Sequence, residues 1–224
     1  MKIKEKKFTF EGIIFDFDLT LADSSKGAIE CIQYAFKELN LPIPSSQDAK
    51  RTIGLSLSDT FLNLTENKYH GKIKDFSLFF IERANEVMTD LTVLFKETPQ
   101  VIDILKKHGL MLGIVSTKFR KRIETILRRD NLLDPFNVII GGEDVSEHKP
   151  DPKCLLLAIE KLNIPSSKLL YVGDTVTDAE TAKRAGISFI AVLSGTTPSN
   201  AFLNYNPYGI IKNISKLQSL IGIL

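Results

Sequence analysis

The sequence predicts an α/β protein, in which a doubly wound parallel sheet carries a small helical domain inserted after the first strand. Three observations support this prediction. A short apolar segment near the N-terminus, Thr9–Phe17, ends in acidic residues. A long stretch with helical patterns follows, and from Pro99 onward helical and strand patterns alternate. Such alternation is typical of a parallel sheet with helices on both faces.

The N-terminal segment Thr9–Phe17 is apolar and rich in β-formers, which predicts a buried strand with charge at its carboxyl end. The helices predicted after it span Lys26–Leu39, Ser45 to about Asn63 with an interruption near Gly54, and about Asp75 to Met88. We find no convincing strand in this region. We therefore assign residues 22–92 to the helical insert and residues 1–21 and 93–224 to the core.

The alternating region supplies the rest of the predicted core. Its predicted strands are Met111–Ser116, Val138–Ile140, Leu169–Val172 and Ser188–Val192. Its predicted helices are Pro99–His108, Arg120–Arg129, Pro152–Leu162, Thr177–Ala185 and about Ile214–Ile221. Sheets of this type bind ligands beyond the carboxyl ends of their strands, so functional residues are expected there.

The composition is that of an ordinary globular protein, with 43% hydrophobic and 25% charged residues among 224 and a net charge of +2. Basic residues are spread along the chain, so we predict no nucleic-acid partner. The densest cluster, lysines 2, 4, 6 and 7, is interpreted as a solvated leader, with a partner-binding arm as the minor alternative. No apolar run reaches membrane-spanning length and no signal-peptide pattern is found, which predicts a cytoplasmic protein without membrane contact.

The two cysteines, Cys31 and Cys154, lie far apart in apolar, helix-like stretches without zinc-type spacing. We predict that both are buried free thiols rather than a disulfide, because a disulfide would imply an oxidising compartment.

Polar residues of four groups follow predicted strands or precede a helix. They are the pair Asp16 and Asp18, the hydroxyl pair Ser116 and Thr117, Lys149 in a loop before a helix, and Asp174 with Asp178. Each group alone has a simpler explanation, such as a turn, a helix cap or a surface lysine. An α/β sheet, however, would gather all four at one edge.

That set of residue types suits phosphoryl transfer. Gathered carboxylates repel one another, and a cation bound by oxygen ligands, Mg²⁺ above all, would hold them together. An aspartate can attack phosphorus to form an aspartyl-phosphate, and a carboxylate two residues on can serve as general acid and base. In an ideal strand both would lie on one face. A lysine and a hydroxyl group can stabilise the phosphoryl oxygens.

In their order and context these residues resemble the motifs of the haloacid dehalogenase-like hydrolase superfamily, over nearly the whole chain. The run from Asp16 to Thr20 is similar to the first motif, and Ser116 to the second. Lys149 in His-Lys-Pro-Asp-Pro looks like the third motif, and the run from Gly173 to Asp178 looks like the fourth. The resemblance implies a Rossmann-like core with a helical cap between the first two motifs, as in the phosphoglycolate phosphatase-like branch.

The resemblance also implies roles. Asp16 would be the nucleophile and Asp18 the general acid and base, while Ser116 and Lys149 would hold the transferring phosphoryl group. Thr117 is a further candidate for substrate binding.

The metal ligands implied by the resemblance are Asp16, the backbone carbonyl of Asp18 and Asp174, with Asp178 as an outer-shell or direct partner of Mg²⁺. One departure is Leu19, where the family commonly has glycine at a sharp backbone turn. Because both catalytic carboxylates and Thr20 remain, we expect modest geometric change and retained activity.

The presence of Asp18 favours phosphoryl chemistry over dehalogenation. A sugar-phosphate mutase of this superfamily would show a cap loop like Lys-Gly-x-Ser-Arg, whereas the run Ile53–Leu57 is apolar at the Lys and Arg positions. Phosphonate cleavage needs a cap lysine, and the lysines of the insert are interpreted as solvated. We therefore predict a phosphatase acting on a small phosphorylated metabolite, with Arg51, Gly54 and Ser56 as candidates in the cap's substrate loop.

The alternatives left open are an inorganic pyrophosphatase or phosphomutase of the same superfamily, and a catalytically silent binding protein on this fold. The resemblance further predicts cap closure about hinges near Ala22–Ser25 and Leu91–Lys96. We expect a monomer or a homodimer.

Overall fold

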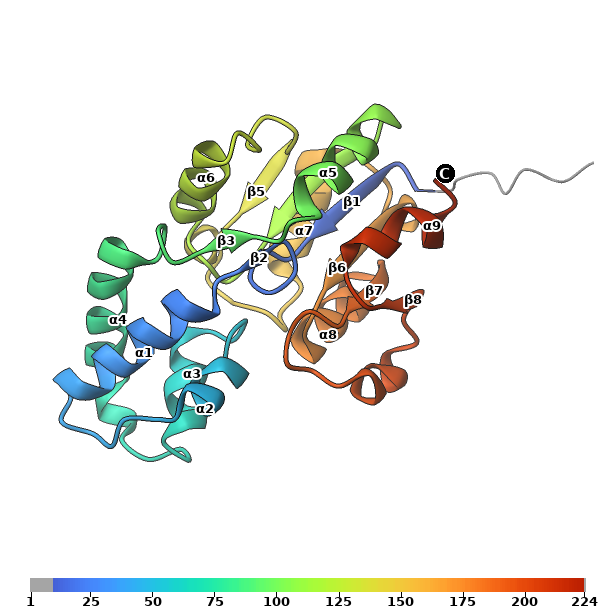
Figure 1. Cartoon of the computed structure of the whole chain (residues 1–224). Helices are drawn as coiled ribbons and strands as arrows, with labels where there is room; N and C mark the ends of the chain where they lie inside the picture. Colours follow the sequence, from blue (N-terminus) through green and yellow to red (C-terminus); the bar gives the residue numbers. More distant parts are fainter. Residues whose placement is uncertain (1–9, 224) are drawn as a thin grey trace, which may run out of the picture.

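A six-stranded parallel sheet forms the centre of the larger part of the protein (Figure 1). The structure is a computed structural model and describes residues 10–223, so the lysine-rich leader lies outside the described residues. The strand order is β5-β4-β1-β6-β7-β8, which places β1 between β4 and β6. The strands are β1 (Gly12–Phe15), β4 (Met111–Val115), β5 (Val138–Ile140), β6 (Leu169–Gly173), β7 (Ser188–Val192) and β8 (Gly209–Ile211).

Helices cover both faces of this sheet because successive strand residues point to opposite sides. In β1, Ile13 and Phe15 pack into the core beneath one set of helices, whereas Ile14 packs into the core beneath the other. The first set is α5 (Thr98–Lys107), α6 (Arg120–Arg129) and α9 (Leu217–Ile221). The second set is α7 (Lys153–Leu162) and α8 (Val176–Ala185). The predicted doubly wound α/β core is confirmed.

The predicted core needs two corrections. The first strand is shorter than Thr9–Phe17, since β1 ends at Phe15 and both aspartates follow it. The C-terminal region contains an edge strand, β8, that was not predicted, because three residues after Pro207 are too few to show a strand period.

Four helices pack together beside the sheet, at the lower left of Figure 1. They are α1 (Ser25–Glu38), α2 (Ser46–Arg51), α3 (Leu57–Leu64) and α4 (Ile73–Val87). Their own apolar cluster contains three aromatic rings: the centroids of Phe61 and Phe76 lie 4.9 Å apart, and Phe36 lies 5.7 Å from each. This cluster is separate from the two clusters that flank the sheet.

A short antiparallel ribbon connects the helical part with the sheet. Ala22 pairs with Leu94 and Asp23 with Val93, forming β2 (Ala22–Asp23) and β3 (Val93–Leu94). The expectation of no strand within residues 22–92 is therefore wrong at its N-terminal boundary. The ribbon coincides with the two segments predicted as hinges.

Cys31 and Cys154 are both buried and unbonded to each other, as predicted. Within residues 10–223, no helix is long and apolar enough to cross a membrane.

Candidate active site

The carboxyl end of the central strand brings together residues that are far apart in the sequence. Asp16 directly follows β1, and its backbone N–H donates to the carbonyl of Val172 in β6 at 2.8 Å. Ser116 directly follows β4 and donates from its backbone N–H to Ile140 in β5 at 3.0 Å. Asp174 directly follows β6. Parallel pairing therefore places these three residues at one edge of the sheet.

Lys149 forms hydrogen bonds to three other buried residues at this edge of the sheet. Its Nζ donates to Asp16 Oδ1 at 2.9 Å, to Asp178 Oδ1 at 2.6 Å and to the Tyr171 hydroxyl at 3.2 Å. The side chains of Lys149, Asp16 and Asp178 are at most 2% exposed. Burial opposes the charge of Lys149, but Asp16 and Asp178 outweigh it and hold the pKa of this lysine well above its ordinary value. Lys149 is thus a fixed positive charge.

Asp16 has one oxygen held and one oxygen free. Oδ1 accepts from Lys149, whereas the buried Oδ2 has no hydrogen-bond partner within the described protein. Burial, with the nearby charges of Asp178 and Asp18, raises the pKa of Asp16 to about 7 against the opposing effect of Lys149. A buried carboxylate oxygen without a partner is costly, so this atom is suited to receive a cation or to attack an electrophile.

Asp174 is held by Thr20 from the first motif, whose hydroxyl donates to Asp174 Oδ1 at 3.2 Å. Burial and the charges of Asp178 and Asp16 raise the pKa of Asp174 well above its usual range. The other carboxylate oxygen faces Gly195 in the loop after β7, where a side chain's β-carbon would come within 1.8 Å of Oδ2. Gly195 therefore leaves the space that this carboxylate fills.

Asp178 lies at the first turn of α8, and its oxygens are engaged by the protein. Oδ1 accepts from Lys149 and from Tyr171 at 2.8 Å, while Oδ2 accepts from the backbone N–H and the hydroxyl of Thr175. The Thr175 hydroxyl in turn accepts from the Asp178 backbone N–H, which completes a capping box at the start of α8.

Three of these aspartates could hold a metal ion. Asp16, Asp174 and Asp178 each offer a carboxylate oxygen within 4.8 Å of the others, and all three are buried. All-oxygen donors, the unpartnered Asp16 Oδ2 and the raised pKa values fit a cation that offsets mutual repulsion. The hydrogen bonds of Asp178 favour Asp16 and Asp174 as the direct ligands, with Asp178 orienting Lys149 behind them.

Asp18 faces a different lysine from Asp16. Because β1 ends at Phe15, strand alternation does not extend to Asp18. Its Oδ1 lies 2.9 Å from Lys118 Nζ, an ion pair without hydrogen-bond geometry, and both side chains are at least 90% buried. Asp18 therefore sits in the wall of the neighbouring pocket with a cation beside it.

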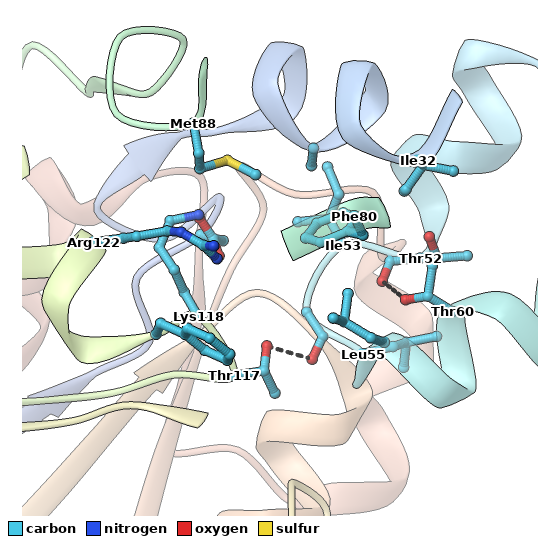
Figure 2. Close-up of a pocket in the computed structure, with 15 residues that line it drawn as sticks. Ile32, Thr52, Ile53, Leu55, Thr60, Phe80, Met88, Thr117, Lys118 and Arg122 are labelled. Atoms are coloured by element: carbon cyan, nitrogen blue, oxygen red, sulfur yellow. Dashed lines mark hydrogen bonds and ion pairs between the residues drawn. The ribbon is translucent and has the colours of Figure 1, made fainter. Parts of the chain in front are cut away.

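Thr117 connects the core to the helical part. Its hydroxyl donates to the carbonyl of Gly54 at 3.4 Å, a contact drawn in Figure 2. Gly54 has a φ of +97°, and a β-carbon there would approach Thr175 to 3.2 Å. The loop that contains Gly54 thus lies against two core loops and covers the strand ends.

A pocket of about 80 Å³ lies between this loop and the core (Figure 2). Its polar side comes from Asp18, Thr117, Lys118 and Arg122. Apolar side chains from the helical part, among them Ile32, Ile53, Leu55, Phe80 and Met88, form much of the remaining wall.

The structure does not bring Arg51 and Ser56 into this pocket. Arg51 is exposed and pairs with Asp48 one helical turn away, at 3.2 Å. Ser56 is the N-cap of α3, where its hydroxyl accepts from the Asp59 backbone N–H and donates to the Asp59 carboxylate. It lines a second hollow that also contains Thr117 and His148.

Three residues of the site were not identified from the sequence. Lys118 directly follows Ser116 and Thr117 in the sequence, and this position was the signal that could have identified it as a site residue. Tyr171 lies inside the apolar strand β6, where nothing in the pattern distinguishes its hydroxyl from a core side chain. Gly195 follows β7, and its position at a strand end was the only cue.

Comparison of the sequence with known proteins supports the resemblance drawn from the motifs. Over 95% of this chain, it is 28% identical to the phosphoglycolate phosphatase of Shigella sonnei, of which 92% is covered. It is 29% identical to the pyrophosphatase PpaX of Oceanobacillus iheyensis, over 94% of this chain and 96% of the relative.

A solved structure from Bacteroides fragilis, described as a haloacid dehalogenase-like hydrolase, is 40% identical with a TM-score of 0.90. The likeness covers 93% of this chain and 99% of that one. The family of haloacid dehalogenase-like hydrolases itself matches residues 13–192. The resemblance drawn from the motifs is thus confirmed, and the chain belongs to the haloacid dehalogenase-like hydrolase family.

Proposed function

We propose that this enzyme is a Mg²⁺-dependent phosphatase that hydrolyses a small phosphorylated metabolite through an aspartyl-phosphate on Asp16. The observation that carries the proposal is the asymmetry of Asp16, whose Oδ1 is fixed by Lys149 while the buried Oδ2 has no partner. A carboxylate held in this way is oriented for attack on phosphorus.

In this proposal, Asp16 and Asp174 bind Mg²⁺ together with the Asp18 carbonyl, and the metal supplies charge neutralisation for the phosphoryl oxygens. Lys149 adds a fixed positive charge, and Ser116 is the candidate hydroxyl donor to the same oxygens. Asp18 protonates the leaving oxygen and later accepts a proton from the water that cleaves the aspartyl-phosphate.

We further propose that residues 22–92 act as a cap that excludes water during the first step, with 1–21 and 93–224 as the catalytic core. The separate aromatic cluster, the β2–β3 ribbon and the contact between Gly54 and Thr117 support this division. Gly54 is the cap residue best placed to approach substrate. A cytoplasmic location and a monomeric or homodimeric state stay predictions.

Release of phosphate from p-nitrophenyl phosphate, with Mg²⁺ and with a chelator, tests this function. Asp16→Asn should lower turnover at least ~10³-fold, because a nucleophile that forms the covalent intermediate has no substitute. The exposed Asp134 offers a matched control, since Asp134→Asn makes the same chemical change far from the site. Full activity of Asp16→Asn would refute the nucleophile assignment.

A pyrophosphatase is the second candidate, supported by the similarity to PpaX. Comparison of kcat/KM for pyrophosphate and for a panel of phosphate monoesters, phosphoglycolate included, separates the two. A phosphomutase is less favoured because the run Ile53–Leu57 carries no cationic side chain. A catalytically silent binding protein is less favoured because Asp16, Asp18 and Asp174 are all present. Absence of turnover on the whole panel would favour the binding protein over the phosphatase.

A further inference from the structure

The loop that directly follows β7 contacts the first motif as well as Asp174. The Ser194 hydroxyl donates to the backbone carbonyl of Leu19 at 2.5 Å, a half-buried contact between residues 175 positions apart. Within residues 10–223, no other group donates to this carbonyl. Ser194 is thus the residue through which this loop holds the turn that follows Asp18.

Leu19 has a backbone conformation that is unfavourable for its side chain. Its φ of 59° lies in the left-handed region, which glycine adopts without steric cost and leucine does not. The turn itself supplies part of the restraint, because the Leu19 N–H donates to the carbonyl of Ala22 at 2.7 Å and the side chain is buried. Ser194 supplies the rest, since it holds the peptide group that leads from Leu19 to Thr20.

That peptide group determines where the Thr20 side chain points. Its N–H end makes only a long hydrogen bond, to the carbonyl of Phe17 at 3.3 Å, whereas its carbonyl end accepts from Ser194 at 2.5 Å. Both ends belong to one planar unit, so fixing them fixes its orientation. Thr20 is fully buried, and its hydroxyl donates to Asp174 Oδ1 at 3.2 Å. A rotation of the peptide group would therefore move the hydroxyl that holds a proposed metal ligand.

The loop after β7 is itself fixed on both sides of Ser194. Leu193, just before it, donates from its backbone N–H to the carbonyl of Ile211 in the edge strand β8 at 2.9 Å. Gly195, just after it, lies against the Asp174 carboxylate. One short loop therefore contacts Asp174 directly through Gly195 and, through Ser194, orients the threonine that binds the same carboxylate.

We propose that Ser194 is a positioning residue, which fixes the Leu19 carbonyl and thereby keeps the Thr20 hydroxyl on its proposed metal ligand. The inference rests on the proposed Mg²⁺-dependent function and deepens it. Groups that orient metal ligands from behind affect metal affinity although they do not touch the metal. Because Ser194 acts only through Leu19 and Thr20, its loss should change the affinity for Mg²⁺ rather than the chemistry of the loaded site.

Calorimetric titration with Mg²⁺, together with a Mg²⁺ titration of phosphate release, tests this role. Ser194→Ala should raise the Kd for Mg²⁺ about 3- to 10-fold, the effect of one neutral hydrogen bond. Turnover at saturating Mg²⁺ should stay near the wild-type value, which a general distortion of the site would not allow. Ser194→Thr keeps the donor and should bind Mg²⁺ like the wild type. Ser199→Ala, the same change at an exposed serine that begins the next helical turn, should leave the Kd unchanged.

A double-mutant comparison shows whether Ser194 acts through Thr20. Thr20→Val removes the hydroxyl with little change of shape, and Ser194→Ala should then add almost nothing to the Kd, because coupled contacts are not additive. Equal increases of Kd with and without the Thr20 hydroxyl, or an unchanged Kd of the Ser194→Ala single variant, would overturn the inference. Absence of turnover by the wild type on every ester would instead refute the phosphatase function, and the calorimetric Kd would still decide the role of Ser194.

Discussion

Gly195 and Asp174 lie so close together that a β-carbon at position 195 would come within 1.8 Å of Asp174 Oδ2 and within 2.7 Å of its Cγ. Real non-bonded atoms do not approach to that distance, so either the loop after β7 or the carboxylate must move. Asp174 is a proposed metal ligand that Thr20 holds from the other side. The absence of a side chain at Gly195 is therefore a condition for the geometry of the site.

Gly195→Ala should weaken Mg²⁺ binding and lower Mg²⁺-dependent turnover about 10- to 100-fold, the usual effect of disturbing a residue that supports a metal ligand. A Mg²⁺ titration of activity measures the change. Gly71→Ala is the matched control, because its new β-carbon would meet nothing within 4 Å. An unchanged Mg²⁺ dependence of Gly195→Ala would mean that Asp174 does not bind the metal.

The raised pKa of Asp16 predicts how stability depends on pH. A carboxyl group whose pKa rises from 3.8 to about 7 on folding binds its proton more tightly in the folded state. Its contribution to stability is then complete below about pH 4 and is lost as the pH rises through about 7. In the absence of metal, the Tm of the wild type minus that of Asp16→Asn should be smaller at pH 8 than at pH 5.5.

Mg²⁺ should reverse this trend, since it replaces the proton as the partner of the carboxylates. At a concentration of one hundred times Kd, ligand binding adds about 2.7 kcal/mol, roughly 5–10 °C in Tm for a protein of this size. The increase should be larger at pH 8 than at pH 5.5. Equal increases at both pH values, measured by thermal denaturation, would contradict the assignment of Asp16 to the metal.

Much of the fold could be predicted because the sheet is buried on both faces. The apolar runs Val138–Ile140 and Ser188–Val192 have the predicted bounds in the structure, as does the helix Arg120–Arg129. The gathering of Asp16, Lys149 and Asp178 could also be anticipated, because parallel strands end at one edge. Neither inference needed side-chain detail.

Contacts that depend on side-chain packing could not be predicted. In the sequence, nothing distinguishes Tyr171 from the other residues of its strand. In the structure, its hydroxyl lies 2.8 Å from Asp178 Oδ1. Lys118 lies in the turn before α6 and Arg122 in the first turn of that helix. Only the structure shows that Lys118 pairs with Asp18, whereas Arg122 donates to the carbonyl of Ile81 and to Asn85 Oδ1. Ser56, expected at the substrate, is engaged in capping α3, a local role that its sequence also allowed.

Leu19 adopts the left-handed conformation that the sequence departure implied, with a φ of 59° and a side chain 2% exposed. Leu19→Gly would relieve about 1–2 kcal/mol of backbone strain but remove buried packing worth about 2–5 kcal/mol. The variant should therefore be less stable by up to about 4 kcal/mol while keeping its activity. Asn40→Gly is the control, since Asn40 has a φ of 53° and is exposed. A more stable Leu19→Gly in urea denaturation would show that strain outweighs packing at this turn.

Lys118 provides the last prediction, because its ammonium lies 2.9 Å from the carboxylate proposed to protonate the leaving group. Lys118→Met removes the charge that positions Asp18, and kcat/KM for an alkyl phosphate should fall about 10- to 100-fold, part of the range for general acid catalysis. The fall should be much smaller for p-nitrophenyl phosphate, whose leaving group needs no proton. Lys121→Met, which changes an exposed lysine three residues further on in the first turn of α6, should change neither rate. An equal loss of kcat/KM on both esters would mean that Lys118 serves binding or folding, because kcat/KM reports the transfer of the phosphoryl group to Asp16, in which Asp18 acts only on the leaving oxygen.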